Sequence, residues 1–392
     1  MRLAFVTETY PPEINGVALT VQSLIESLRE RDHRVEVIRP RQSGDRAAIT
    51  EDELCVAGSA LPRYPGLRFG WPARGQLKAR WRANRPDAVY IATEGPLGYS
   101  ALGAARALDI PVLTGFHTRF DDYLGHYGIG VLKPAAVVWL RRFHNRAQAT
   151  LVPTPALRAE LMARGHDNVL LLRRGIDADR FSPARRSETV RASWGIGPND
   201  LAVLYVGRLA PEKNFDLLLA SFRAIHAQRP DARLVLIGDG PARAALEESV
   251  PEGVFCGVRT GDELAANYAS GDLFVFPSLS ETYGNVTLEA MASGVPVVAY
   301  AQGAALEHLR DEVSGAAVTP GDAPAFIAAC VSIATDGSRR SGMRSAARAA
   351  VASLLPQQVA IDYENLVLQV AAKTEQSAPT LAHAGATQGS DT

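Results

Sequence analysis

The chain begins the same strand-and-helix unit twice, about 200 residues apart. Residues 3–7 form an apolar run, followed by a turn-rich loop and a helical pattern over residues 17–31. Residues 201–206 repeat that order, with a loop over 207–214 and a helical pattern that ends at Gln228. Apolar strands that alternate with helices form parallel sheets from βαβ units. The repeat therefore predicts an α/β chain with two such domains and a cleft between the strand ends of their sheets.

The length of 392 residues fits this division, because each half is large enough to bury a core of its own. We expect a first domain over residues 1–176 and a second over residues 182–354, with the linker in the glycine- and proline-punctuated segment between them. Residues 45–54 lack a regular pattern and are expected to be irregular. From Lys373 to residue 392, Ser, Thr, Gln, Gly and Ala dominate, which predicts a disordered tail.

Two carboxylates mark the most informative segment. The apolar run 273–277 predicts a buried strand, and Gly284-Asn285-Val286 opens the next helix. Glu281 lies between them, and Glu289 is expected about two turns into the helix. Open α/β sheets bind ligands at the carboxyl ends of their strands, and the first N–H groups of a helix attract anions. One carboxylate can thus meet one end of a ligand, and the other can meet its far end. The alternative is that Glu281 only complements the dipole of the helix and that Glu289 is a solvated helix residue.

A second loop gathers positive charge. Arg208 and Lys213 follow the strand over residues 201–206 and precede a helix, whose N-terminus is partly positive. Two cations and a helix N-terminus at one point predict a phosphate site. The alternative is a pair of ordinary surface cations, and the glycine and strand context argues against it.

These segments resemble the retaining glycosyltransferases with two facing Rossmann-like domains, the GT-B architecture. The resemblance rests on Glu281-Thr-Tyr-Gly-Asn-Val-Thr-Leu-Glu289 and on Gly207-Arg-Leu-Ala-Pro-Glu-Lys-Asn214. It covers nearly the whole chain before the tail, because Gly16, His117 and both segments occur in the family's order. The similarity is greatest to bacterial GDP-mannose-dependent α-mannosyltransferases. In this architecture, the apolar-periodic helix over residues 357–372 crosses back onto the first domain.

The resemblance implies roles for the second-domain residues. Arg208 and Lys213 would hold the donor's diphosphate, beside the helix N–H groups of Gly284, Asn285 and Val286. Glu281 would contact hydroxyls of the donor sugar, and Glu289 would accept the ribose hydroxyls. The loop with Val258 and Arg259 would read the nucleobase. The resemblance implies that Arg208, Lys213, Glu281 and His117 form the catalytic group.

The resemblance also assigns two first-domain residues. Gly16 would approach the donor's phosphates from the opposite domain when the cleft closes. His117, at the end of the strand over residues 111–115, would contact the donor sugar. A lone histidine at such a place is otherwise a structural residue, and that alternative stays open.

The implied activity is transfer of a sugar, mannose from GDP-mannose, to a hydroxyl of a membrane lipid or a glycan with net retention. Within the family, the alternative is a UDP-sugar donor, as in glucosyl- and sulfoquinovosyl-diacylglycerol synthesis. Two alternatives belong to other functional classes: a sugar-nucleotide epimerase and a non-catalytic nucleotide-sugar-binding protein. A nicotinamide dehydrogenase is disfavoured, because the first strand lacks the G-x-G-x-x-G fingerprint.

Neither a metal nor a nucleic-acid partner is expected. Cys55, Cys256 and Cys330 are scattered, and the eight histidines form no metal-binding spacing. We therefore expect a metal-independent enzyme whose ligands are the nucleotide sugar and its acceptor.

The charge is divided unevenly between the halves. Residues 1–175 carry 24 Lys and Arg against 17 Asp and Glu, whereas the remainder carries 17 against 25. A basic half is attracted to anionic lipid, and the segments 68–74, 78–82 and 137–143 mix aromatic and basic residues as interfacial elements do. No apolar run has the length of a membrane span. We expect a cytoplasmic protein with peripheral contact at the inner face of the cell membrane.

Overall fold

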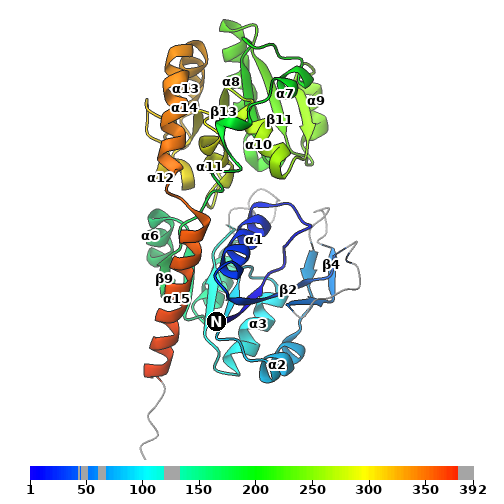
Figure 1. Cartoon of the computed structure of the whole chain (residues 1–392), viewed down its shortest axis with the longest axis vertical. Helices are drawn as coiled ribbons and strands as arrows, with labels where there is room; N and C mark the ends of the chain where they lie inside the picture. The colour runs from blue at the N-terminus through cyan, green and yellow to red at the C-terminus, as the bar shows by residue number, and fades with distance from the viewer. Residues whose placement is uncertain (43–44, 46–51, 61–67, 119–132, 378–392) are drawn as a thin grey trace, which may run out of the picture.

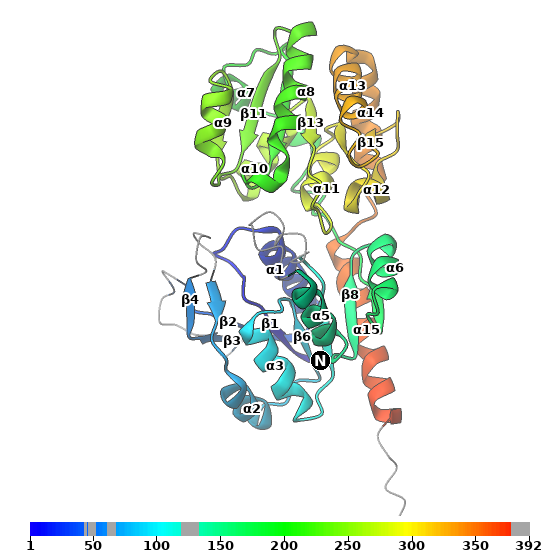
Figure 2. The same cartoon turned by 180° about the vertical axis from the view of Figure 1, so that it is seen from behind.

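The structure is a computed structural model, and it describes all residues except 43–44, 46–51, 61–67, 119–132 and 378–392. Figure 1 shows two α/β halves that lie one above the other along the long axis of the molecule. Each half contains its own parallel sheet with helices around it, as Figure 2 shows from behind. The predicted fold class is confirmed; the exact domain limits remain our proposal.

The first half is built on a seven-stranded parallel sheet with the order β3-β2-β1-β6-β7-β8-β9. Its strands are β1 (Arg2–Val6), β2 (Arg34–Pro40), β3 (Glu53–Val56), β6 (Ala88–Ile91), β7 (Val112–Gly115), β8 (Ala149–Val152) and β9 (Val169–Leu171). Its helices are α1 (Gly16–Arg29), α2 (Arg74–Ala83), α3 (Pro96–Arg106), α5 (Lys133–His144) and α6 (Pro155–Ala163), and β4 (Gly58–Ala60) pairs with β5 (Arg68–Gly70) in a separate antiparallel pair. Successive residues of β1 alternate between two core clusters: Leu3 and Phe5 join one, and Ala4 and Val6 join the other. Helices therefore cover both faces of this sheet.

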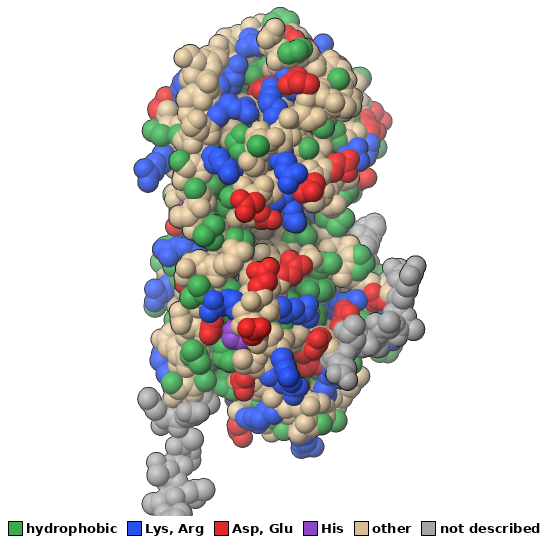
Figure 3. All heavy atoms as spheres, in the orientation of Figure 1, with side chains coloured by type: hydrophobic (Ala, Val, Ile, Leu, Met, Phe, Trp, Pro, Cys, Tyr) green, Lys and Arg blue, Asp and Glu red, His purple; other side chains and the backbone are tan. Residues whose placement is uncertain are grey.

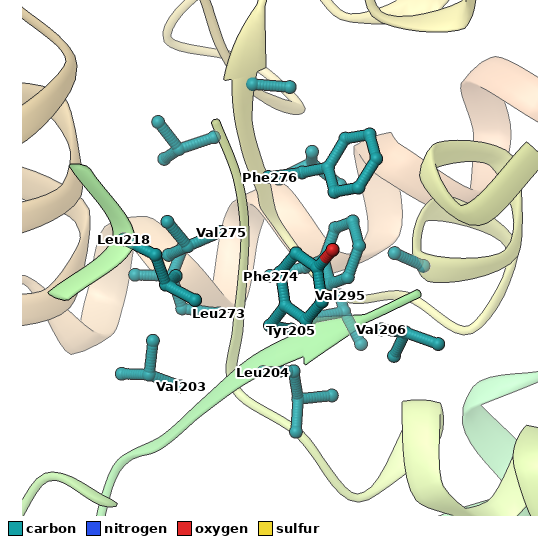
Figure 4. Packing of buried hydrophobic residues seen from close by; sticks show 14 of the residues in the cluster. Val203, Leu204, Tyr205, Val206, Leu218, Leu273, Phe274, Val275, Phe276 and Val295 are labelled. Carbon is teal, nitrogen blue, oxygen red and sulfur yellow. The ribbon is translucent and has the colours of Figure 1, made fainter. Parts of the chain in front are cut away.

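The second half has a six-stranded parallel sheet with the order β12-β11-β10-β13-β14-β15. Its strands are β10 (Ala202–Val206), β11 (Arg233–Ile237), β12 (Val254–Gly257), β13 (Leu273–Phe276), β14 (Val297–Tyr300) and β15 (Gly315–Val318). Its helices are α7 (Glu188–Ser193), η3 (Pro211–Lys213), α8 (Phe215–Gln228), α9 (Arg243–Ser249), α10 (Gly261–Ala269), α11 (Asn285–Ala292), α12 (Gly303–His308), α13 (Ala323–Thr335) and α14 (Gly337–Val351). The central strands β10 and β13 are buried along their whole length, and Figure 4 shows their side chains packed in one cluster. The loops that follow these two strands therefore start from a rigid base.

A buried arginine fixes the opposite ends of the same two strands. Arg191 of α7 is fully buried, and its guanidinium donates to the Asp272 carboxylate at 2.9 Å and to the Ser270 carbonyl at 2.8 Å. Asp272 precedes β13 and also accepts a hydrogen bond from the Ala202 N–H at 2.9 Å, where β10 begins. This network sets the register between β10 and β13, and with it the relative position of their loops.

The last helix, α15 (Pro356–Ser377), returns to the first half as predicted. It packs along α1, and Ala360, Tyr363, Val367 and Val370 are buried in the same cluster as Leu3 and Phe5. The segment that leaves the first half and the segment that returns to it lie against each other, because the Ile176 N–H donates to the Leu354 carbonyl at 2.7 Å. A Cβ on Gly175 would lie only 2.7 Å from the Pro356 backbone, so this close approach requires glycine.

Two expectations about irregular segments were wrong. Glu53 and Leu54 lie in strand β3, because they continue the parallel pairing with β2 at the sheet edge. The helix α15 runs through Ser377, so the first five residues assigned to the tail are helical. The rest of the tail, and residues 46–51, lie outside the described residues.

Candidate active site

The two predicted motifs meet at the carboxyl ends of β10 and β13. These strands are neighbours in the sheet, so the loop with Arg208 and Lys213 lies beside the loop with Glu281. The Lys213 Nζ lies 2.5 Å from Glu281 Oε1, and the Ser278 hydroxyl donates to the same oxygen at 2.8 Å. Residues 68 positions apart thus form one polar cluster at the mouth of the second sheet.

Glu281 is ionised in this cluster. Burial by itself raises the pKa of the carboxyl, but the charge and hydrogen bond of Lys213 and the hydrogen bond from Ser278 outweigh it, so the pKa lies below its ordinary value. Only 12% of the Lys213 side chain and 17% of the Glu281 side chain are exposed. The pair therefore presents a nearly neutral but strongly dipolar surface, with a cation and acceptor oxygens side by side.

Arg208 lies in the same loop and is oriented by Glu212. The Arg208 guanidinium forms an ion pair with the Glu212 carboxylate, whose side chain is 1% exposed, whereas 36% of the Arg208 side chain is exposed. A buried carboxylate thus orients a guanidinium whose side chain is about one third exposed. The arrangement suits an anion receptor, because the Arg208 donors are held in place before a ligand arrives.

Glu289 lies about one turn into α11, not two, because it is only four residues beyond Asn285, the first residue of the helix. It is not a solvated helix residue. The Tyr268 hydroxyl of α10 donates to Glu289 Oε2 at 2.8 Å, and burial raises the pKa of the carboxyl to about 7 in spite of this hydrogen bond. A half-buried carboxylate with such a pKa is stabilised in its ionised form by a ligand that donates hydrogen bonds to it.

The N-terminus of α11 faces the first half. Gly284 caps it in the left-handed region at φ 87°, which favours glycine. Asn285 is the first helical residue, and its side-chain amide donates to the Thr20 hydroxyl of α1 at 3.0 Å, across the two halves. Val286 is the next helical residue and packs against the second-half core. A small pocket beside this N-terminus is lined by Ser278, Glu281, Tyr283, Gly284 and Thr287, among others.

Gly16 lies on the opposite side, at the first position of α1. The Asn15 side chain caps this helix by accepting from the Val17 and Ala18 N–H groups at 3.1 and 2.9 Å. A Cβ on Gly16 would meet no atom within 4 Å, so the fold itself does not require glycine here. Helix α1 also carries Thr20, which contacts Asn285, so Gly16 lies near the junction of the two halves.

His117 lies just beyond β7, and both of its ring nitrogens contact protein groups. Nε2 lies 2.7 Å from the Tyr90 hydroxyl, and Nδ1 lies 2.7 Å from the Arg174 guanidinium. Burial, followed by the charges of Arg174 and His144, holds the pKa of His117 well below its ordinary value, so the ring is neutral. The predicted contact with the donor sugar remains untested.

Val258 and Arg259 follow β12 at the edge of the second sheet. Val258 is 49% exposed, and Arg259 Nε lies 3.1 Å from Glu263 Oε1. Nothing in these contacts tests their predicted role in reading the base. Within the described ranges, the structure contains no cluster of three or more His, Cys, Asp or Glu that could hold a metal ion.

Sequence reasoning missed five residues of the site. They are Tyr90, Arg174, Glu212, Tyr268 and Ser278. Glu212 lies inside one recognised motif and Ser278 lies shortly before the other, so their positions next to the motif residues could have identified them. Tyr90, Arg174 and Tyr268 lie on other elements, and only the folded chain brings them to the site.

Two facing parallel-sheet domains, with cations and carboxylates at the strand ends of the second, form the arrangement of a GT-B glycosyltransferase. Family models match both halves: Glycosyltransferase Family 4 over residues 14–180 and Glycosyl transferases group 1 over residues 200–336. A GDP-mannose-dependent alpha-mannosyltransferase from Mycobacterium tuberculosis is 38% identical over 307 residues, 76% of this chain and 79% of that protein. One from Corynebacterium glutamicum is 33% identical over 351 residues, 88% of this chain and 84% of that protein.

Among solved structures, sucrose-phosphate synthase from Thermosynechococcus elongatus has the same fold, with a TM-score of 0.76 over 95% of this chain and 99% of that chain at 21% identity. The chain belongs to the group 1 glycosyl transferases, the GT-B family that includes these GDP-mannose-dependent α-mannosyltransferases. It is therefore a hexosyltransferase, and the predicted family and enzyme class are confirmed.

Proposed function

We propose that this enzyme transfers mannose from GDP-mannose to a hydroxyl group of a lipid or glycan, with retention and without a metal ion. The observation that carries the proposal is the cluster of Lys213, Glu281 and Arg208 beside the N-terminus of α11. These groups match the two ends of a sugar diphosphate: cations and N–H groups for the phosphates, and carboxylate oxygens for sugar hydroxyls. The proposed donor follows from the relatives that are 33–38% identical, which are GDP-mannose-dependent alpha-mannosyltransferases.

The chemistry assigned to these residues is leaving-group stabilisation. The bond from the anomeric carbon to the phosphate oxygen breaks while the acceptor oxygen bonds on the same face, and the acceptor proton passes to the leaving phosphate. Lys213, Arg208 and the N–H groups of α11 neutralise the charge that develops on the diphosphate. Because Lys213 already pairs with Glu281, this carboxylate suits a hydrogen-bond acceptor for the sugar better than a nucleophile. The cations supply the neutralisation for which other enzymes use a metal.

A UDP-sugar donor is the second candidate within the family. A sulfoquinovosyl transferase from Arabidopsis thaliana is 30% identical over 88% of this chain, and an alpha-monoglucosyldiacylglycerol synthase from Streptococcus pneumoniae is 28% identical. The phosphate and ribose contacts assigned to this site are common to all nucleotide diphosphates. The base and the sugar must therefore be tested directly.

Thermal shifts with GDP, UDP, ADP, GDP-mannose and UDP-glucose test the donor. We expect the guanine ligands alone to raise the melting temperature, because a ligand at 100 times its Kd adds about 2.7 kcal/mol to the free energy of unfolding. The Arg208→Ala variant should lose the shift, whereas Arg233→Ala, away from the site, should keep it. A preference for the uridine ligands would replace GDP-mannose as the proposed donor, and a shift that survives in Arg208→Ala would contradict the assigned phosphate contact.

Turnover of GDP-mannose in the presence of a chelator tests metal independence.

The proposal includes peripheral contact of the first half with an anionic membrane. Trp71 is 56% exposed and Trp139 43% exposed, and Trp139 stacks on Tyr99 with ring centroids 6.0 Å apart. Trp81, which was predicted to be interfacial, is 1% exposed and belongs to the core, because its face of α2 packs onto the sheet. Basic and acidic side chains are interspersed on the face that Figure 3 shows, so the contact would not use this face. In the parts of the chain that the structure describes, no helix has the length and apolarity to span a bilayer.

Vesicle flotation tests this contact. We expect the protein to float with phosphatidylglycerol vesicles and not with phosphatidylcholine vesicles, and the Trp139→Ser variant to float less. The matched control is Leu306→Ser, which removes a 49% exposed apolar side chain from the second half. Equal flotation with both lipids, or an equal loss in both variants, would contradict an electrostatic and aromatic contact through the first half.

A further inference from the structure

Arg174 determines which nitrogen of His117 carries the proton. A guanidinium has only N–H donors, so the 2.7 Å contact between Arg174 Nη2 and His117 Nδ1 requires Nδ1 to accept. The proton of the neutral ring then lies on Nε2, which donates to the Tyr90 hydroxyl at 2.7 Å. Arg174, His117 and Tyr90 therefore form a directed hydrogen-bond chain that starts at a cation.

The backbone at β7 is shaped around this chain. A Cβ on Gly115 would lie 2.2 Å from the Tyr90 hydroxyl and 2.4 Å from His117 Nε2. The backbone of Gly115 lies outside the left-handed region, so the lack of space for a Cβ, and not the backbone conformation, accounts for the glycine. The contact between His117 and Tyr90 is thus built into the strand end, two residues before the histidine.

Arg174 also lies where the two halves join. It immediately precedes Gly175 and Ile176, the segment that packs on the returning chain at Leu354. Tyr283 belongs to the loop of Glu281, and its hydroxyl lies 3.2 Å from His308 Nε2. Burial raises the pKa of Tyr283, and the charges of Arg174 and, less strongly, Arg173 oppose this rise. Arg174 therefore contacts the His117 strand end of the first half and is close enough to the donor loop of the second for its charge to act there.

We propose that Arg174 is a positioning residue for sugar transfer, which holds His117 as the neutral Nε2–H tautomer and couples that ring to the segment joining the two halves. The inference rests on the proposed function, because the ring matters to catalysis only if His117 lies at the sugar. The groups that face His117 are Tyr90 from β6, Arg174 after β9 and His144 from α5. His144 itself lies 3.2 Å from the buried Glu94 carboxylate.

The test compares Arg174→Gln, Arg174→Lys and the matched control Arg173→Gln, an exposed neighbour on the same segment. We expect Arg174→Gln to lower kcat by at least about tenfold with little change in the KM for the donor, because a misplaced group slows the reaction more than binding. The acid limb of its pH–rate profile should move to higher pH. Without the Arg174 charge, the pKa of His117 rises, so the neutral ring is lost earlier as the pH falls.

Arg174→Lys keeps the charge, so its acid limb should stay near that of the wild type, and Arg173→Gln should change neither parameter. Wild-type kcat and pH profile in Arg174→Gln would overturn the proposal, as would equal losses in Arg173→Gln. If Arg174→Gln does not fold, Tyr90→Phe decides, because the ring keeps its contacts with Phe5 and Tyr363 while the chain loses its last member. Unchanged kcat in Tyr90→Phe would then overturn it.

The tautomer has a readout that does not depend on activity. In ¹⁵N NMR spectra of the unliganded protein, assigned with His117→Gln, we expect Nδ1 of His117 to lack a proton and Nε2 to carry one. A protonated Nδ1 would overturn the proposal even if the enzyme transfers mannose. The predicted tautomer in a protein that does not use GDP-mannose would instead count against the donor alone.

Discussion

Replacing Lys213 by methionine lowers kcat about 10²–10³-fold, which corresponds to a loss of about 3–4 kcal/mol of transition-state stabilisation. The loss is large because Lys213 is a mostly buried cation at the place assigned to the leaving diphosphate, where solvent screening is weak. Steady-state kinetics with GDP-mannose measure the effect, and the KM should change much less than kcat. The control is Lys78→Met, which makes the same chemical change on α2, away from the site.

The same variant leaves the Glu281 carboxylate buried without its cation. Burial is the largest influence on the pKa of Glu281 and raises it, so the pKa should rise once Lys213 is gone. We therefore expect Lys213→Met to lower the melting temperature and the double variant Lys213→Met/Glu281→Gln to regain part of it. A single variant with wild-type kcat would exclude Lys213 from leaving-group stabilisation.

We expect the affinity for GDP to fall by up to about tenfold for each pH unit below about 7, because the proposed contact requires Glu289 to lose a proton. In the proposed contact, the ionised carboxylate accepts hydrogen bonds from ribose hydroxyls at both oxygens, whereas the protonated form would use one oxygen to donate. Above this pKa the affinity should be flat. Isothermal titration calorimetry from pH 5 to pH 8 measures the slope and, in buffers of different ionisation heat, the proton released.

The Glu289→Gln variant should lose this slope and keep only the contribution of the GDP phosphate, which titrates near pH 6. The stability of the unliganded enzyme should respond with the opposite sign. The pKa of folded Glu289 is about 7, above the unfolded value of 4.5, so its ionisation favours the unfolded chain and stability declines as the pH rises between these values. Equal pH dependence of GDP affinity in the wild type and in Glu289→Gln would exclude the proposed contact between Glu289 and the ribose.

The sequence was sufficient to predict the halves of the site but not their contact. Strand and helix patterns placed Glu281 and Lys213 in loops at strand ends, because buried parallel strands are continuous apolar runs bounded by glycine and proline. Their pairing at 2.5 Å depends on β10 and β13 being neighbours, although β11 and β12 lie between them in the chain. Strand order is a property of the whole sheet, and no local pattern contains it.

Contacts with side chains on other helices and strands could not be predicted from local sequence patterns either. Tyr268 reaches Glu289 because α10 and α11 pack together, and this contact excludes the alternative in which Glu289 is a solvated helix residue. Trp81 shows the converse: an aromatic residue among cations fits both an interfacial helix and a helix with one buried face. Only the packing of α2 on the sheet decides between the two.

Helix α15 has a consequence for the order in which the chain folds during synthesis. The core of the first sheet includes Tyr363, Val367 and Val370, which a ribosome adds about 200 residues after strand β9. At about 5–20 residues per second this gap lasts roughly 10–40 s. The core of the second sheet draws all its buried members from residues 176–351, so it can be completed earlier. We expect the second domain to reach its native state first, and the amino-terminal domain to remain open to chaperones until the last helix leaves the ribosome.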